Sequence, residues 1–135
     1  MSDETHHAGS CLCGAVTFEI EGAFDSFFLC HCQRCRKGSG SAHASNLFID
    51  NGTLTWLSGE DNIRTYAVPG ARHVRSFCAT CGSMLPQAAP SGRLKIPAGS
   101  LDTPVALRPV AHIFDGSRAD WDHDLADVPC FDEGP

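Results

Sequence analysis

The chain has 135 residues, of which 42% are hydrophobic, and its 10 lysines and arginines against 16 aspartates and glutamates give a formal charge of −6 at pH 7. This length suits one domain, and the negative charge disfavours nucleic acid as the main partner, because that binding depends on neutralising phosphates with Lys and Arg. No stretch approaches the roughly 18 uninterrupted apolar residues of a membrane span, and residues 1–10 lack an apolar signal segment, so we expect a cytoplasmic protein without a membrane partner.

The apolar residues fall in short runs that predict strands. Val16, Phe18 and Ile20 alternate with polar residues, which is typical of a half-buried strand. Further strands are expected, in chain order, at residues 27–29, 46–49, 54–57, 63–68, 73–77, 84–88, 94–96 and 110–114. Prolines between and within the later runs exclude long helices, and only a helical turn capped by Ser100 is expected. The predicted fold class is therefore mainly β.

These elements predict a single domain at residues 9–128. A flexible N-terminal tail, with His6 and His7, is expected at residues 1–8, and a C-terminal tail at residues 129–135. The last part of the chain is acidic and irregular, and Trp121 is the side chain that we expect to anchor it to the core. The sequence does not define the oligomeric state.

Seven of the eight cysteines lie in three tight groups. The groups are Cys11-x-Cys13, Cys30-x-Cys32-x-x-Cys35 and Cys78-x-x-Cys81, whereas Cys130 stands alone. Disulfide frameworks usually scatter their cysteines along an exported chain, so this grouping favours bound metal. Zinc is the preferred ion, because it removes the repulsion between clustered thiolates; iron–sulfur ligation and four disulfides are the alternatives.

The seven clustered cysteines divide into four and three, which predicts two zinc ions. The set of four would close a structural site between distant segments; its members are Cys11, Cys13, Cys78 and Cys81. The set of three could hold a catalytic ion and leave one coordination position open for water or substrate; its members are Cys30, Cys32 and Cys35. A fourth protein ligand would instead close the second site and make both ions structural.

Basic residues follow the middle cysteine group in a stretch expected to be a flexible loop. Arg34, Arg36 and Lys37 would either offset the charge of the thiolates or receive a carboxylate of the substrate.

Histidines near the same group are candidates for proton transfer. In an extended segment His31 points away from the face that its two neighbouring cysteines share, so we expect it behind the metal or in the core. His43 or His112 could move a proton, and no spacing argument selects between them.

The residues that flank the cysteines form extended motifs. They read GSCLCGAV at residues 9–16, CHCQRCRK at 30–37 and FCATCGS at 77–83, followed by GSLD at 99–102 and HIF at 112–114. Together these motifs resemble the glutathione-dependent formaldehyde-activating enzyme (GFA) family. The resemblance extends from about residue 9 to residue 121.

The resemblance implies an Mss4-like fold of twisted antiparallel sheets built around two zinc sites. It also implies the division of ligands given above, with the set of four structural and the set of three catalytic. The family is named for forming S-(hydroxymethyl)glutathione from glutathione and formaldehyde, which is classed as a carbon–sulfur lyase reaction. The implied partners are therefore a small thiol such as glutathione and an aldehyde.

Three functional hypotheses follow. In the first, the protein is a zinc-dependent carbon–sulfur lyase, or thiol–aldehyde adduct synthase, whose substrate thiol binds the open zinc position, ionises and attacks an aldehyde carbon. The alternative is a non-catalytic two-zinc binding module, a role kept open because the family also resembles a chromosome-associated protein. The third is a redox or metal-buffering protein, in which the set of three would lose zinc and form disulfides.

Overall fold

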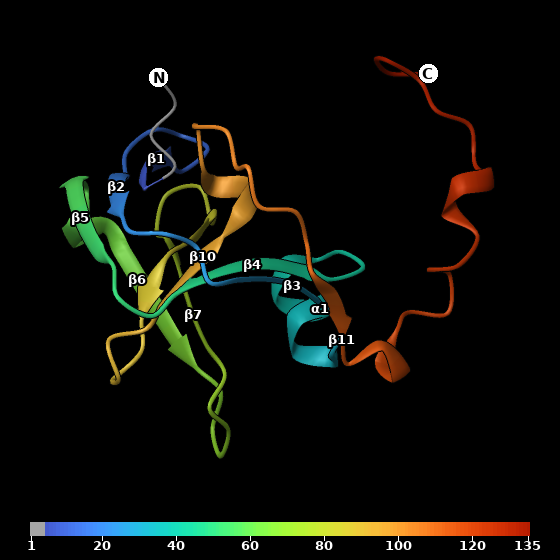
Figure 1. Ribbon diagram of the computed structural model, residues 1–135, viewed down its shortest axis with the longest axis horizontal. Coiled ribbons are helices and arrows are strands. Elements are labelled where there is room, and N and C mark those ends of the chain that lie inside the picture. Colours follow the sequence, from blue (N-terminus) through green and yellow to red (C-terminus); the bar gives the residue numbers. More distant parts are fainter. Residues whose placement is uncertain (1–4) are drawn as a thin grey trace.

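The computed structural model describes residues 5–135, and short strands in three small sheets make up most of its regular structure (Figure 1). The first sheet has the order β1-β2-β5, with bounds His6–Ser10, Thr17–Glu21 and Thr53–Ser58. The second has the order β11-β3-β4-β10-β9, with bounds Ala111–Ile113, Ser26–Cys30, Ala44–Ile49, Leu94–Pro97 and Gln87–Ala88. The third has the order β6-β7-β8, with bounds Ile63–Ala67, Val74–Cys78 and Met84–Leu85.

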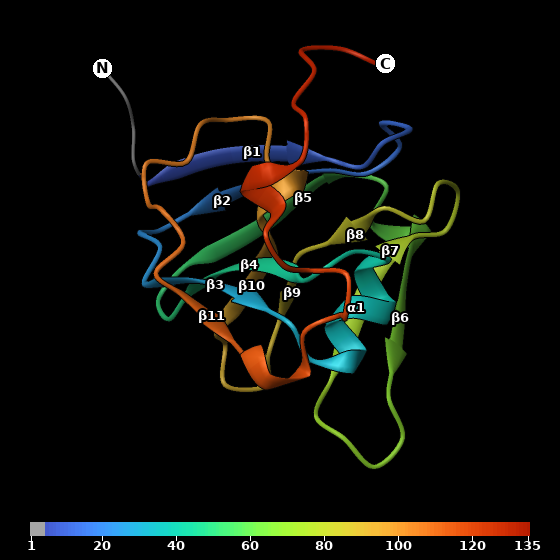
Figure 2. The same cartoon turned by 90° about the vertical axis from the view of Figure 1, so that its right-hand side faces the viewer.

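The strand pairs are antiparallel, except that β11 lies parallel to β3 (Figure 2). The predicted mainly β class is therefore confirmed. The expected strands are present within a few residues of their predicted bounds, except that the run at residues 84–88 is divided at Pro86 into β8 and β9, which belong to different sheets. Two short 3₁₀ helices lie between strands, and two follow the last strand; they are η1 Glu60–Asn62, η2 Ala98–Ser100, η3 Asp115–Ser117 and η4 Leu125–Asp127. No helix in the described part of the chain is long and apolar enough to cross a membrane.

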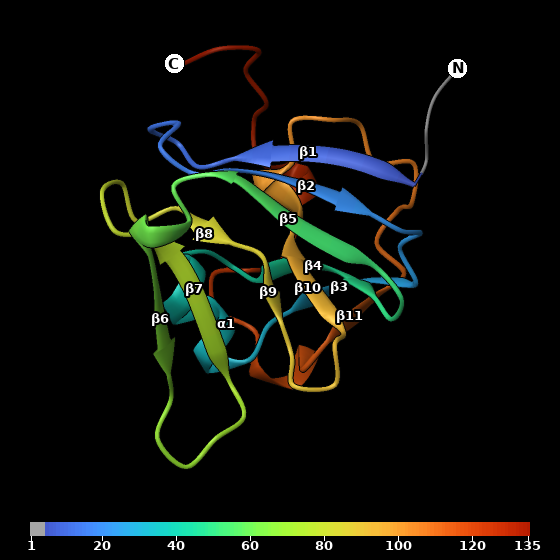
Figure 3. The same ribbon diagram turned by 90° about the vertical axis from the view of Figure 1, so that its left-hand side faces the viewer.

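The core lies where the first two sheets face each other (Figure 3). Alternation along β2 buries Phe18 and Ile20 completely, and β4 and β10 contribute Leu47 and Ile96, which are also inaccessible to solvent. Each such side chain contributes about 1.5–3 kcal/mol of hydrophobic free energy on burial. Cysteines belong to the same core, because Cys11 and Cys78 pack in this cluster.

The sequence did not predict two elements. β1 begins at His6 and pairs with β2, so it takes in part of the expected N-terminal tail, and His7 is buried rather than frayed. The expected flexible basic loop is instead the helix α1, Gln33–Ser39. The Sγ atom of Cys32 accepts a hydrogen bond from the Cys35 amide and caps the start of α1, and Gly40, with a φ of 66°, ends it.

The anchor of the C-terminal segment also differs from expectation. Trp121 is 57% exposed, so the expectation that it anchors the segment is wrong. Its neighbour Asp122 is only 5% exposed, because Arg118 and His31 surround its carboxylate. Beyond this point η4 and the C-terminus run outside the sheets (Figure 1).

The packing of Gly9 predicts a large effect of one added methyl group. A Cβ atom at Gly9 would lie 2.2 Å from the Phe18 ring and 2.5 Å from the Ser100 carbonyl oxygen. We expect Gly9→Ala to lower the free energy of unfolding by about 1–3 kcal/mol, measured by urea denaturation. Gly99→Ala is the matched control, since nothing lies within 4 Å of a Cβ there. Equal stabilities of the two variants would refute this account of the packing.

Candidate metal centres and the adjoining pocket

The first candidate metal centre joins the turn after β1 to the end of β7. The four Sγ atoms of this cluster lie within 4.8 Å of one another; they belong to Cys11, Cys13, Cys78 and Cys81. Two tight turns bring them together, because the Gly14 amide donates to the Cys11 carbonyl at 3.1 Å and the Gly82 amide donates to the Cys78 carbonyl at 2.8 Å. Both glycines have a positive φ, 81° and 77°, a conformation that disfavours a side chain.

Two thiols of this cluster, Cys81 and Cys13, differ strongly in pKa. The hydroxyl and amide of Ser83 lower the pKa of Cys81 to about 5. The Ala15 amide also lowers the pKa of Cys13, but the neighbouring thiol of Cys11, burial and the other two thiols outweigh it and raise that pKa to about 11. The four thiols therefore do not all ionise near neutral pH on their own, and a cation between them would allow it.

The second candidate centre is formed where β3 runs into α1. Cys30 ends β3, Cys32 caps α1 and Cys35 lies in its first turn, and their three Sγ atoms lie within 4.8 Å of one another. Burial and the adjacent thiols raise the pKa of Cys35 far above its usual range. Burial alone would raise the pKa of Cys32. Hydrogen bonds from the Cys35 amide and from the two other thiols outweigh burial, so the pKa of Cys32 is lowered.

A cavity of about 510 Å³ opens beside the three cysteines. Four of the side chains that line it are cationic; they are Arg34, Arg72, Arg93 and Lys95. All three cysteines, His73, Phe48, Gln87, Ala89 and Phe114 complete the lining. An acidic protein thus has a positively charged pocket next to its thiols.

Contacts within the protein hold two of these cations in place. The Arg93 guanidinium lies over the Phe48 ring, 4.3 Å from its centroid, and its Nε is 3.0 Å from Asp50 Oδ1. Lys95 Nζ donates to the Val74 carbonyl at 2.9 Å. Burial lowers the pKa of Lys95, while Cys35 and Cys30 act against this shift.

Of the other candidates from the sequence, only Arg34 reaches this cavity. Arg36 and Lys37 lie on α1 but are not among the described residues that line it. His43 and His112 lie elsewhere, packed against the fully buried ring of His31, with ring centroids 5.1 and 5.0 Å from it. The structure therefore separates the two proposed proton carriers from the pocket. Cys130, which stands alone in the sequence, is exposed.

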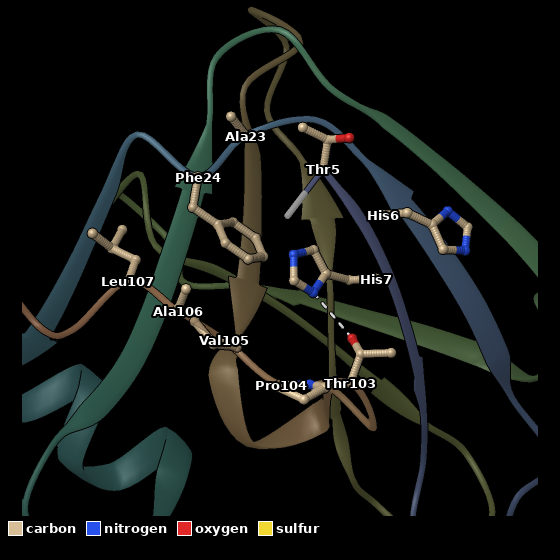
Figure 4. A pocket seen from close by; sticks show the side chains of 10 residues that line it. All are labelled: Thr5, His6, His7, Ala23, Phe24, Thr103, Pro104, Val105, Ala106 and Leu107. Atoms are coloured by element: carbon tan, nitrogen blue, oxygen red, sulfur yellow. Dashed lines mark hydrogen bonds between the residues drawn. The ribbon is translucent and has the colours of Figure 1, made fainter. Parts of the chain in front are cut away.

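A larger cavity, of about 840 Å³, lies between β1, the turn before β3 and residues 103–107 (Figure 4). The buried His7 projects into it, where its Nδ1 lies 3.0 Å from Thr103 Oγ1 and its ring packs 4.6 Å from Phe24. Apolar side chains form most of its wall, and none of the described residues that line it is a cysteine. The clustered thiols therefore line the smaller cavity and not this one.

Comparison with known proteins identifies the family. A family model described as glutathione-dependent formaldehyde-activating enzyme matches residues 6–117. The chain belongs to this family. A Halomonas elongata protein named "Putative glutathione-dependent formaldehyde-activating enzyme" is 37% identical over 86 residues, which are 57% of this chain and 52% of that protein. The chain thus matches about half the length of this curated relative.

A solved structure supports the fold of this GFA-family chain. The crystal structure of a Rhodobacter sphaeroides protein, 27% identical in sequence, matches with a TM-score of 0.58. The match covers 78% of this chain and 98% of that one. The resemblance noted in the sequence is therefore confirmed at the level of the family.

Sequence reasoning missed most of the pocket of this GFA-family chain. Arg72 and His73 follow β6, whereas Arg93 and Lys95 flank the start of β10, so no spacing rule links them to the cysteines. They become neighbours only when the sheets form. Both sets of thiols nonetheless fit the sulfur ligands that zinc takes, and either group could hold a metal ion.

The four-cysteine cluster predicts a coupling between metal content and stability. We expect Cys78→Ser to remove one equivalent of bound metal and to destabilise the fold, because Cys78 is fully buried and two sheets meet at the cluster. Metal analysis of gently purified protein and thermal unfolding would measure both effects. Cys130→Ser is the control, since this exposed thiol lies outside the clusters. Unchanged metal content in the Cys78 variant would contradict the assignment.

Proposed function

We propose that the protein is a carbon–sulfur lyase that joins a small acidic thiol such as glutathione to an aldehyde such as formaldehyde. The observation that carries this proposal is the pocket in which three clustered cysteines and four cationic side chains line one cavity. Membership of the GFA family supports glutathione and formaldehyde as the substrates.

The proposed reaction requires no oxidant or reductant. The sulfur of the thiol attacks the carbonyl carbon and forms the new C–S bond, while the C=O π electrons move to oxygen. The proton of the thiol ends on that oxygen, so the product is a thiohemiacetal with a new hydroxyl group. In the reverse direction the C–S bond breaks, which is lyase chemistry.

The three-cysteine cluster would hold a zinc ion, and the four-cysteine cluster a second, structural one. When bound at the three-cysteine cluster, zinc would supply the positive charge that keeps a substrate thiol ionised at neutral pH. The raised pKa values of Cys30 and Cys35 support this occupancy, because a nearby cation would allow all three thiols to ionise.

The cations of the pocket would bind the carboxylates of the thiol. Glutathione carries two carboxylates and one ammonium group, so a cluster of cations favours it over a neutral thiol. Arg93 is well suited to this task, because its contacts with Phe48 and Asp50 fix its planar guanidinium, which can bind a carboxylate through two hydrogen bonds.

His73 is the histidine placed to move the proton. It lines the pocket, whereas His43 and His112 do not. Burial and the neighbouring Lys95, Arg34 and Arg75 lower the pKa of His73, so its imidazole is neutral near pH 7 and can accept a proton from the thiol.

Removal of one thiol from the three-cysteine cluster should abolish the reaction. We expect the Cys32→Ser variant to bind one equivalent of metal less than the wild type. We also expect it to form the adduct no faster than the uncatalysed reaction. Exchange spectroscopy by NMR with labelled formaldehyde and glutathione would measure the rate, and the Cys130→Ser variant is the control. A Cys32 variant with the full rate would refute the mechanism, and a wild-type protein that gives no acceleration would leave the two-zinc binding module as the function.

Removal of Arg93 should weaken binding of the thiol more than it slows turnover. We expect Arg93→Ala to raise KM for glutathione about tenfold, since a lost charge-assisted hydrogen bond is worth about 1.4 kcal/mol or more. The same substitution at Arg108, which is exposed and does not line the pocket, should change KM little. Equal KM values for the two variants would exclude a role of Arg93 in binding the carboxylate.

A further inference from the structure

A third cluster of potential ligands lies on the other side of the β3–α1 turn. The ligand atoms of His31, His112 and Asp115 lie within 4.8 Å of one another. These residues come from the β3–α1 turn, from β11 and from the start of η3. We propose that they bind a divalent transition-metal ion at a third site. This proposal does not rest on the function proposed for the cysteine pocket.

The parallel pairing of β11 with β3 builds this cluster. Ile113 pairs with Cys30, and the His31 amide donates to the Ile113 carbonyl at 2.9 Å. This register places the two imidazoles side by side, with His31 Nε2 at 2.8 Å from His112 Nδ1. Two ring nitrogens therefore converge on one point, and a small separation of the rings would admit an ion between them.

The far nitrogen of His31 supports the same assignment. Its Nδ1 is buried without a hydrogen-bond partner among the described residues, yet Asp122 Oδ2 lies 3.3 Å away, and both side chains are almost inaccessible. A carboxylate behind the distal nitrogen is the usual arrangement around a metal-binding histidine, because it keeps the proton on that nitrogen. The lone pair of Nε2 would then be free for a metal.

One arginine contacts both the Asp115 carboxylate of the cluster and the Asp122 carboxylate behind His31. Arg118 Nη1 lies 2.9 Å from Asp115 Oδ1, and its Nε lies 3.2 Å from Asp122 Oδ2. With neutral imidazoles, two carboxylates and one guanidinium leave a net charge of −1, which favours a cation. His112 and Asp115 are exposed, so an ion can enter from solvent.

The ligand set indicates which ions the site would accept. Two imidazole nitrogens and one carboxylate oxygen suit Co²⁺, Ni²⁺, Cu²⁺ or Zn²⁺, whereas the cysteine clusters offer only sulfur. A third imidazole stands nearby, because the His43 ring lies 5.1 Å from His31 and 6.5 Å from His112 between centroids. The spectrum of a bound ion would therefore distinguish this site from the cysteine clusters.

Cobalt is the probe that we would use. The full chain, loaded with two equivalents of zinc to fill the two cysteine clusters, is dialysed against excess Co²⁺, and bound cobalt is measured by metal analysis and by absorption. We expect one equivalent of cobalt with weak visible bands and without the intense thiolate-to-cobalt charge-transfer band. Cobalt uptake that shows only this charge-transfer band, or no uptake beyond the cysteine clusters, would overturn the proposal.

Variants test the assignment of ligands. We expect His112→Ala to abolish this uptake, and Asp122→Asn to weaken it about 10- to 100-fold, as changes behind a metal-binding histidine do. Asp115→Asn should also weaken it, and its exposed position keeps the fold intact. His123→Ala is the matched control, because this exposed histidine pairs with Asp124 outside the cluster. Equal cobalt uptake by His112→Ala and His123→Ala would refute the site.

Discussion

Electrostatic repulsion between crowded thiolates is the constraint on which this structure depends. Within the four-cysteine cluster the pKa values range from about 5 at Cys81 to about 11 at Cys13. Two of its members, Cys11 and Cys78, lie in the apolar core, where a thiol is tolerated but an uncompensated thiolate is costly. A cation bound there would remove this conflict. It would also join the β1-β2-β5 sheet to the β6-β7-β8 sheet, which share no strand pairing.

The same repulsion at the three-cysteine cluster explains why an acidic protein concentrates positive charge in one pocket. Lys95 is half-buried beside this cluster although burial disfavours its charged form, and Cys35 and Cys30 act against that effect. Three thiolates around a divalent ion would leave a net negative charge, which Arg34, Arg72 and Arg93 can also balance. Cationic side chains that would offset the charge of the three thiolates also line the pocket that an anionic thiol would enter. Offsetting thiolate charge and receiving a substrate carboxylate are therefore compatible roles for these residues.

Local patterns in the sequence predict most of the strands and both cysteine clusters, because alternation and ligand spacing act over a few residues. β1 was missed because it has no apolar alternation, and Gly9 matters there through the Phe18 ring and the Ser100 carbonyl that pack against it. α1 was missed because a cysteine caps it and a Gly-Ser stretch follows. Hydrophobicity favoured Trp121 as the anchor, but Asp122 is buried instead, between Arg118 four residues earlier and the distant His31. The cationic side chains of the pocket meet the cysteines only when the sheets pack, and motif spacing does not predict that packing.

The parallel strand β11 links the C-terminal part of the chain to the three-cysteine cluster. Its register against β3 holds His112 at His31, and His31 lies between Cys30 and Cys32 in the chain. Neighbouring side chains in an extended segment face opposite ways. Residues 30–32 therefore place two thiols in the three-cysteine cluster on one side and the imidazole of His31 beside His112 on the other. A shift of the His31 backbone would therefore move both clusters at once. Asp122, which pairs with Arg118, contacts this histidine from far along the chain.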